Sequence, residues 1–229
     1  MEEKYKEAFR LHSLDIRYLR RLEESKRIIA FVLKYYKKPY IAFSGGKDST
    51  VLTHLIVAVN PEIMVFHWDY GCFYILEKVQ CEIMENASKL GVINFRVETS
   101  DLYNKLGRKA INILGREMLG KVSPRLKREG YDSVFVGLRK EESLKRKRRI
   151  NMNRSLTKIK EFWPLSEWSW LDIWAYIVSN SLPYLSHYDL YGPIIGWDKV
   201  RMVTFFDSEF DFLGSSNIDG VLMWRFKNL

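Results

Sequence analysis

Residues 40–49 read Tyr-Ile-Ala-Phe-Ser-Gly-Gly-Lys-Asp-Ser, an apolar run followed at once by a glycine turn. The first four residues predict a short buried strand, which begins after Pro39. The turn leads into a predicted helix with Val51, Leu52 and Leu55 on one side, and Asn60-Pro61 ends it. A strand, a tight turn and a helix in this order are typical of the first unit of an α/β sheet.

The same alternation of strands and helices continues along the chain. Further strands are predicted at residues 63–68, 92–97 and 133–136, and a weaker one at 158–163. Helices are predicted at 74–90 and from Ser169, where Ser169-x-x-Asp172 has capping-box spacing and Pro183 ends the helix. Right-handed βαβ units explain this order. We therefore predict a doubly wound, mostly parallel five-stranded sheet with helices on both faces.

The segments on either side of the alternation are predicted to pack onto this core. Residues 1–36 have apolar residues at helical spacing, and Ser25 interrupts the stripe, so they form one long helix or two. We divide the chain into an N-terminal helical extension (1–36), an α/β core (37–165) and a C-terminal aromatic appendage (166–229), all within a single domain.

Composition narrows the class of protein. The 229 residues include 37 Lys and Arg against 28 Asp and Glu, a net charge of +9 that favours polyanionic partners such as phosphate-rich small molecules, RNA or DNA. No apolar run approaches the ~18 residues of a membrane span. The charged N-terminus predicts no secretory signal, and two cysteines are too few for a disulfide framework. These features predict a cytoplasmic protein.

The loop after the first strand is the predicted ligand site, because doubly wound sheets bind ligands beyond the carboxyl ends of their strands. It offers backbone N–H, hydroxyl and ammonium donors to phosphate from Ser44, Gly45, Gly46, Lys47 and Ser49. Asp48 can cap the following helix or hold a Mg²⁺ ion that bridges phosphates. The loop is not a Walker A motif, since the GxxxxGK[ST] pattern is absent.

Residues 44–49 resemble the PP-loop of the adenine nucleotide alpha hydrolase-like superfamily, in the lysine-containing form of its phosphoadenosine phosphosulfate (PAPS) reductase and ATP sulfurylase branch. Three further stretches resemble this branch in the same order: the strand ending in Asp69-Tyr70-Gly71, the Gly-x-Arg-x-x-Glu-Ser stretch from Gly137 to Arg146, and the tryptophan-rich series from Trp163 to Asp189. The resemblance spans about 26–192 and implies the Rossmann-type fold of that superfamily.

The resemblance also implies roles for individual residues. Residues 44–49 would hold the phosphates of ATP or PAPS, and Asp69, Tyr70 and Gly71 would lie beside the adenine and ribose. The later stretch would add Gly137, Arg139, Glu142 and Arg146. Arg139 and Arg146 would pair with phosphate or sulfate oxygens, with Glu142 orienting them. Catalysis would be mainly electrostatic and rest on Lys47, Asp48 and Arg139, with Mg²⁺ where Asp48 holds it.

Two chemistries fit such an enzyme, both at the 5′-phosphate end of the nucleotide. One transfers or reduces the sulfonate of PAPS with an external thiol. The other splits ATP between its α- and β-phosphates and adenylates an acceptor. The alternative is a nucleotide-binding or nucleic-acid-associated module that kept the fold without turnover. A thiol reductant, a partner subunit and a homodimer all remain open as partners.

Cysteine usage departs from the resemblance. Thioredoxin-dependent PAPS reductases carry a C-terminal Glu-Cys-Gly-x-His tail, whereas this sequence ends Phe226-Lys227-Asn228-Leu229 and has no cysteine after Cys81. Two cysteines cannot supply the four ligands of an iron–sulfur cluster, so none is expected. Cys72 follows the Asp69–Gly71 turn, which leaves a substitute redox role and an inert buried thiol open, and Cys81 is predicted to pack in the core.

Five consecutive cationic residues run from Lys145 to Arg149. A solvated surface, a grip on the 3′-phosphate of PAPS and a contact with a nucleic-acid backbone all fit such a run. Nucleic-acid binding calls for aromatic residues among the charges, and none occurs between 144 and 151, which favours the nucleotide. His12, His54, His67 and His187 are scattered, so no zinc site is predicted.

Overall fold

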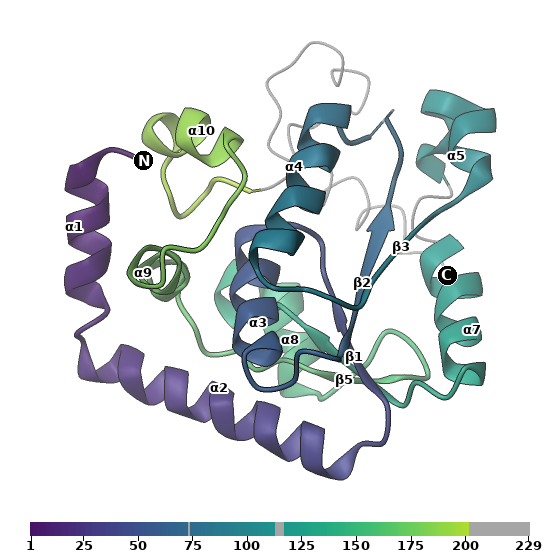
Figure 1. Ribbon diagram of the computed structural model, residues 1–229, viewed down its shortest axis with the longest axis horizontal. Helices are drawn as coiled ribbons and strands as arrows, with labels where there is room; N and C mark the ends of the chain where they lie inside the picture. The colour runs from purple at the N-terminus through teal and green to yellow at the C-terminus, as the bar shows by residue number, and fades with distance from the viewer. Residues whose placement is uncertain (73, 113–116, 202–229) are drawn as a thin grey trace.

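The computed structural model describes residues 1–72, 74–112 and 117–201. In this part of the chain five parallel strands form one sheet in the order β3-β2-β1-β4-β5 (Figure 1). The strands are β1 (Pro39–Ala42), β2 (Met64–Asp69), β3 (Phe95–Thr99), β4 (Ser133–Val136) and β5 (Lys160–Phe162). The predicted α/β fold with a five-stranded parallel sheet is confirmed, including the weakly indicated fifth strand.

Side chains on the strands alternate between two cores, as the twofold periodicity of a strand requires. Ile41 and Phe43 join a cluster on one face of the sheet, whereas Tyr40 joins a second cluster on the other. The first cluster contains buried residues of α3 (Lys47–Val57), α4 (Glu77–Lys89) and α9 (Trp170–Ser179). The second contains residues of α5 (Asp101–Leu106), η1 (Gly107–Asn112) and α7 (Ser123–Arg128). The sheet is therefore covered on both faces.

The N-terminal extension consists of two helices, α1 (Glu3–His12) and α2 (Ile16–Tyr35). The break lies at residues 13–15, where the Asp15 side chain caps α2 by accepting a hydrogen bond from Arg17 N at 2.6 Å. The predicted interruption at Ser25 was wrong. Ser25 is buried inside α2, and its hydroxyl bonds Arg21 O and Pro164 O. In Figure 1, α1 lies beside α9, and α2 runs along the lower edge of the molecule.

Several element boundaries differ from those predicted. The helix that follows Ser169 ends at Ser179, four residues before the predicted stop at Pro183. The helix predicted at 74–90 begins at Glu77, because Tyr74 and Ile75 are instead buried in a turn before it. The strand predicted at 92–97 lies at 95–99. The remaining elements are η2 (Met118–Val122), η3 (Lys140–Glu142), α8 (Leu144–Asn151) and α10 (His187–Ile195). Residues 202–229 of the predicted appendage lie outside the described residues. No described helix is both long and apolar enough to cross a bilayer.

The strand order places the loop after β1 at a topological switch point. From β1 the chain builds β2 and β3 on one side, and then crosses to build β4 and β5 on the other. The connections that leave β1 and β4 therefore diverge, and a crevice opens between them at the carboxyl edge of the sheet. The Ser44–Ser49 loop and the residues that follow β4 both border this crevice.

Candidate functional site

The loop at residues 44–49 is a compact turn that only glycine allows at position 45. Gly45 has φ +83°, and a Cβ there would overlap the side chain of Ile83. Gly46 is the N-cap of α3, so the first N–H groups of that helix face the loop. Ser49 Oγ donates to Gly46 O at 2.9 Å and closes the turn. The result is a helix N-terminus held at the carboxyl edge of the sheet.

A cavity of about 310 Å³ opens beside this loop. On one side its lining is apolar and aromatic, from Ala42, Phe66, Trp68, Tyr70, Met118 and Val136. On the other it is polar, with three cations, two carboxylates and two hydroxyls, from Ser44, Lys47, Asp48, Ser49, Glu142, Arg146 and Arg201. Its volume is at the lower end of the ~300–1,000 Å³ that small-molecule sites have. One wall suits a flat apolar ring and the other suits an anion.

Gly137 brings the two sides of the crevice together. A Cβ at this position would lie 3.1 Å from the backbone of Asp48 and Ser49, so the chain after β4 packs directly against the first turn of α3. Both Gly137 and the loop line the cavity. This close approach leaves too little room for a Cβ, which explains why position 137 is a glycine.

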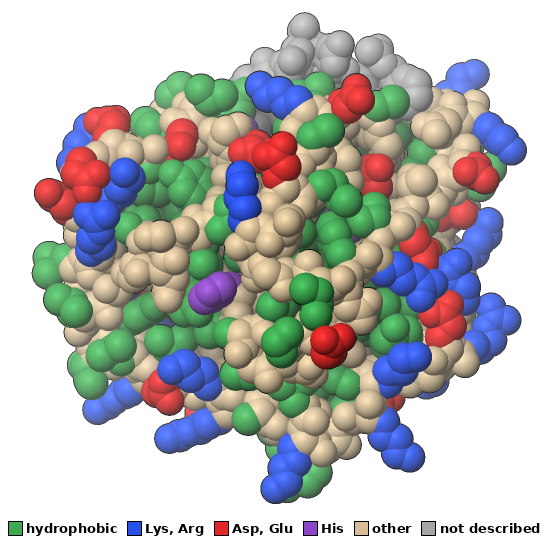
Figure 2. All heavy atoms as spheres, in the orientation of Figure 1, with side chains coloured by type: hydrophobic (Ala, Val, Ile, Leu, Met, Phe, Trp, Pro, Cys, Tyr) green, Lys and Arg blue, Asp and Glu red, His purple; other side chains and the backbone are tan. Residues whose placement is uncertain are grey.

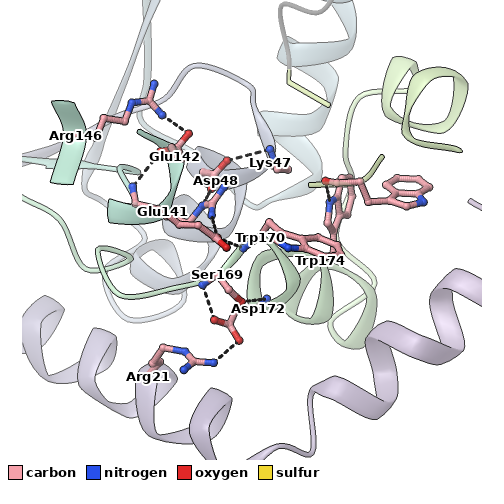
Figure 3. A network of polar contacts seen from close by, with 12 residues as sticks. Arg21, Lys47, Asp48, Glu141, Glu142, Arg146, Ser169, Trp170, Asp172 and Trp174 are labelled. Carbon is pink, nitrogen blue, oxygen red and sulfur yellow. Dashed lines mark hydrogen bonds and ion pairs between the residues drawn. The ribbon is translucent and has the colours of Figure 1, made fainter. Parts of the chain in front are cut away.

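Lys47 and Asp48 lie in a buried charge network at the start of α3 (Figure 3). Lys47 is 3 % exposed, and its ammonium lies 3.5 Å from Asp48 Oδ2 and donates to Val200 O at 3.1 Å. Burial lowers the pKa of Lys47, and the neighbouring Asp48 only partly offsets this effect. Burial acts to raise the pKa of Asp48, but Arg139 and Lys47 outweigh it and hold that pKa below its usual range.

Arg139 is buried behind the loop. It is 3 % exposed. Its Nε donates to Asp48 Oδ1, and its Nη1 donates to Glu141 Oε2 at 2.8 Å. Burial alone would lower the pKa of Arg139, but Asp48 and Glu142 raise it. In this structure Arg139 therefore neutralises the carboxylate next to the loop lysine. The role of Arg139 in binding phosphate oxygens stays a prediction.

Glu142 holds two arginines at the cavity. Its Oε1 pairs with Arg146 and accepts a hydrogen bond from Arg201 at 3.1 Å, while its Oε2 accepts the backbone N–H of Arg139 at 3.0 Å. Arg146 and Arg201 both line the cavity. The predicted arrangement of Glu142 beside Arg146 is present, and Arg201 adds a second cation to it.

The network continues from the loop to the tryptophan-rich segment. Glu141 accepts the backbone N–H of Trp170 at 2.6 Å (Figure 3), and because it also accepts a hydrogen bond from Arg139, it ties the start of α9 to that arginine. The predicted capping box is present, because Ser169 and Asp172 bond each other's backbone N–H groups. Asp172 is fully buried and also accepts from Arg21 of α2 at 2.8 Å. The site is thus joined to the N-terminal helices through α9.

The Asp69–Gly71 turn contributes unequally to the cavity. Tyr70 lines it and stacks on Tyr103, with ring centroids 6.1 Å apart. Asp69 Oδ1 instead accepts the backbone N–H of Gly71 at 2.7 Å, and Gly71 has φ +79°. Asp69 and Gly71 therefore shape the turn that presents Tyr70. Their contact with adenine and ribose stays a prediction.

Asp48 does not fit a magnesium ligand in this arrangement. One of its carboxylate oxygens accepts from Arg139 and the other faces the Lys47 ammonium, so a divalent cation would meet two positive groups at once. No cluster of three or more metal-ligating side chains occurs among residues 1–72, 74–112 and 117–201.

Both cysteines are exposed. The prediction that Cys81 packs in the core was wrong, since it lies on the outer side of α4, whose buried face is formed by Val79, Ile83, Asn86 and Ala87. The alternative that Cys72 is an inert buried thiol was also wrong, because Cys72 is exposed. The described residues that line the cavity include no cysteine. A thiol for any redox step must therefore come from elsewhere than this lining.

Several cavity residues were missed by the sequence analysis, among them Phe66, Trp68, Tyr188 and Arg201. Phe66 and Trp68 lie on β2 two residues apart, so both point to the same face of the sheet. That alternation could have identified them. Tyr188 accepts the backbone N–H of Lys47 at 3.2 Å from a position 141 residues away. Tyr188 belongs to the series from Trp163 to Asp189 that resembles the family, whereas no local signal marks Arg201.

Comparison with known proteins identifies the family. The profile of the phosphoadenosine phosphosulfate reductase domain matches residues 38–197, which contain the whole sheet and the cavity lining apart from Arg201. The chain belongs to the phosphoadenosine phosphosulfate reductase domain family. The resemblance drawn from residues 44–49, 69–71 and 137–146 is confirmed at the level of the family.

Curated relatives agree with this assignment. An adenosine 5′-phosphosulfate reductase of Bacillus cereus strain Q1 is 30% identical over 189 residues, covering 76% of this chain and 78% of that protein. One of Bacillus mycoides strain KBAB4 is 30% identical over 188 residues with the same coverage. A crystal structure of the PAPS reductase of Candida auris in a phosphate complex has a TM-score of 0.54 at 16% identity, covering 72% of this chain and 84% of that one. This structural likeness supports the fold.

Proposed function

We propose that the cavity binds an adenosine nucleotide with a sulfated 5′-phosphate, of the adenosine 5′-phosphosulfate or PAPS type, and that the protein transfers its sulfonate group to an external thiol. The observation that carries the proposal is the two-sided cavity at the switch point of the sheet. It has aromatic walls on one side and Lys47, Arg146 and Arg201 on the other. The names of the curated relatives support the same class of substrate.

The lining of this cavity favours one orientation of the proposed nucleotide. Phe66 and Trp68 offer apolar surface to an adenine ring, and Tyr70 extends that surface. The anionic end of the nucleotide then lies at the N-terminus of α3, where backbone N–H groups and the helix dipole favour negative charge. Arg146 and Arg201 add two guanidinium groups on the same side. Separation of an aromatic wall from a cationic one favours a nucleotide over a free anion.

The chemistry assigned to the protein is mainly electrostatic. A thiolate attacks the sulfur of the substrate and forms a new S–S bond. The bond between that sulfur and the bridging 5′-phosphate oxygen breaks, and its electron pair leaves with AMP. Negative charge thus grows on the leaving phosphate, next to Lys47 and the α3 N-terminus, which stabilise it. Attack by a second thiol on the thiosulfonate then releases sulfite and forms a disulfide.

Turnover with a synthetic thiol tests this proposal. With adenosine 5′-phosphosulfate or PAPS and excess dithiothreitol, we expect the protein to release sulfite together with AMP or its 3′-phosphorylated form, in equal amounts. With ATP we expect no pyrophosphate. Pyrophosphate release from ATP would instead assign the protein to ATP cleavage. A rise in melting temperature with these nucleotides but no product from any of them would leave only a binding module. Either result would overturn the proposed reaction.

A further inference from the structure

A second cavity lies outside the nucleotide site, between α2 and the edge of the sheet at β5. Its volume is about 430 Å³. Most of its lining is apolar or aromatic, from Ile28, Phe31, Ile150, Phe162 and Trp163. It shares no lining residue with the first cavity. We refer to it as the α2–β5 groove.

Three charged side chains also line the groove, and two of them are open to solvent. Glu161 is buried and pairs with Arg149 of α8. Glu24 is 60% exposed, and its ion pair with Arg27 on the same helix is long, at 3.8 Å. The groove therefore calls for an occupant with an apolar surface, which can also carry a positive charge beside Glu24.

The corner between α1 and α2 carries apolar side chains that face solvent. Leu11 is 72% exposed, Leu14 73%, Ile16 61% and Leu19 41%. Arg20, the next residue, is exposed, and it belongs to none of the ion pairs in the described part of the chain. Figure 2 shows hydrophobic side chains on the surface at the lower left, where α1 meets α2 in Figure 1. We refer to residues 11–19 as the α1–α2 corner.

The corner and the groove lie along one face of α2. Ile16, Arg20, Glu24 and Phe31 follow one another at spacings of four, four and seven residues, which places them on the same side of the helix. Glu24 and Phe31 line the groove, and all four side chains are exposed. Ile16 lies about 22 Å along the helix axis from Phe31. An apolar projection and an apolar groove thus lie at the two ends of one exposed face.

We propose that the α2–β5 groove binds the α1–α2 corner of a second copy of this chain, so that two copies form a symmetric dimer with antiparallel α2 helices. A two-fold axis that crosses α2 at residue 22 brings each copy's corner to the other's groove. Ile16 then lies opposite the partner's Ile28, and Arg20 lies opposite the partner's Glu24, because the members of each pair are equally distant from residue 22. The axis repeats both contacts.

A second copy matches the groove in both apolar surface and charge. Its corner supplies exposed aliphatic side chains, whose removal from water favours association. Arg20 supplies the positive charge, at the distance from the corner that Glu24 has from the far end of the groove. The same register brings Arg17 opposite the partner's Arg27, and Asp15 limits their repulsion because it pairs with Arg17 at 2.9 Å.

Sedimentation equilibrium of the full chain and of two charge variants tests the proposal. We expect the wild type to reach twice the mass of a single chain as its concentration rises. Arg20→Glu places like charges opposite each other twice in the dimer, and so does Glu24→Arg. Each variant alone should associate at least about 10-fold more weakly than the wild type. An equimolar mixture of the two should regain the wild-type affinity, because the two reversed side chains meet each other and so do the two unchanged ones.

A third variant tests the apolar contact. Leu14→Ala with Ile16→Ala should weaken dimerisation at least about 10-fold, since it removes most of the apolar projection. The matched control, Leu190→Ala with Ile194→Ala, changes two side chains of α10 that are 60% and 78% exposed, and it should dimerise like the wild type. Melting temperatures of all variants verify folding.

Three results would overturn the proposal. The first is a wild type that stays monomeric, and the second is a dimer that the Leu14 and Ile16 changes leave intact. The third is a mixture of the Arg20 and Glu24 variants that associates no better than either alone. A folding defect cannot imitate the expected recovery on mixing, because neither chain changes when the other is added. Failure of nucleotide turnover would leave this test unaffected, since its readout is the mass of the assembly.

Discussion

Lys47→Ala should weaken binding of adenosine 5′-phosphosulfate at least about 100-fold, which corresponds to ~3 kcal/mol. The reason is the position of the ammonium group. Lys47 is 3 % exposed, lines the nucleotide cavity and lies 3.5 Å from Asp48. Removal of Lys47 takes a full positive charge from a site with little water. It also leaves the negative charge of Asp48 less neutralised, so the electrostatic potential at the site becomes less favourable to an anion. Calorimetric titration of both proteins measures the change.

This loss of affinity should occur without loss of the fold. Burial lowers the pKa of Lys47, which means that the folded state pays a cost to keep this amine charged. Because Asp48 keeps its ion pair with Arg139, the variant should remain folded, and the melting temperature of the ligand-free protein verifies this. Lys89→Ala on the exposed end of α4 is the matched control and should bind normally. Equal affinity of Lys47→Ala and wild type would refute the assigned site.

Asp172→Ala should lower the free energy of unfolding by about 3–5 kcal/mol, the usual cost of breaking a buried ion pair. Asp172 is fully buried and lies 2.7 Å from His12 Nε2 and 2.8 Å from Arg21. It also accepts the backbone N–H of Ser169 at 2.6 Å as part of the α9 capping box. Its loss would leave partly buried donors on three segments without their acceptor. Urea denaturation measures the change, with the exposed Glu85→Ala as control.

The contribution of Asp172 to the free energy of unfolding should depend on pH. Burial acts to raise its pKa, but the hydrogen bonds from Arg21 and His12 outweigh burial and lower it from the ordinary value of 3.8. Its contribution to stability is therefore present above about pH 4 and is lost as the pH falls through the lowered pKa of the folded state. The difference between wild type and Asp172→Ala should be full at pH 7 and smaller at pH 2. A pH-independent difference would show that packing, and not charge, carries the effect.

Burial of His187 should also make the fold sensitive to mild acid. Burial lowers the pKa of His187 to about 4, with Lys47 adding to this effect and Arg201 O opposing it. The unfolded chain binds a proton near the ordinary value of 6.5, so stability should fall as the pH drops from 6.5 towards 4. His187→Gln should flatten this part of the curve in denaturation experiments between pH 7 and pH 4. An unchanged slope would contradict the assigned burial.

Local signals predicted the part of the site that is contiguous in sequence. The strand at 40–43 and the Ser44–Ser49 turn depend on neighbours in the chain, and so does the Ser169–Asp172 capping box. Glycine at 45 is required by a backbone conformation and glycine at 137 by a close approach of two segments, and both leave a trace in the sequence. These features can therefore be predicted from the sequence alone.

Features created by distant contacts could not be predicted. Arg201 reaches the cavity through Glu142, 59 residues earlier, and nothing near Arg201 indicates this. The basic run 145–149 was analysed as one unit, but the fold divides it. Arg146 faces the nucleotide cavity and Arg149 pairs with Glu161, whereas Lys145, Lys147 and Arg148 remain on the surface. The prediction that Cys81 packs in the core failed because Cys81 lies outside the face of α4 that is buried, which Val79, Ile83, Asn86 and Ala87 form.

A crystal structure of the protein with adenosine 5′-phosphosulfate, grown without a thiol, tests the central claim most directly. We expect the adenine ring to lie against Phe66 and Trp68, and the sulfated phosphate to lie within hydrogen-bond distance of Lys47 Nζ and the first N–H groups of α3. Electron density for the nucleotide at any other place on the protein, or with its anionic end directed away from Lys47, would contradict it.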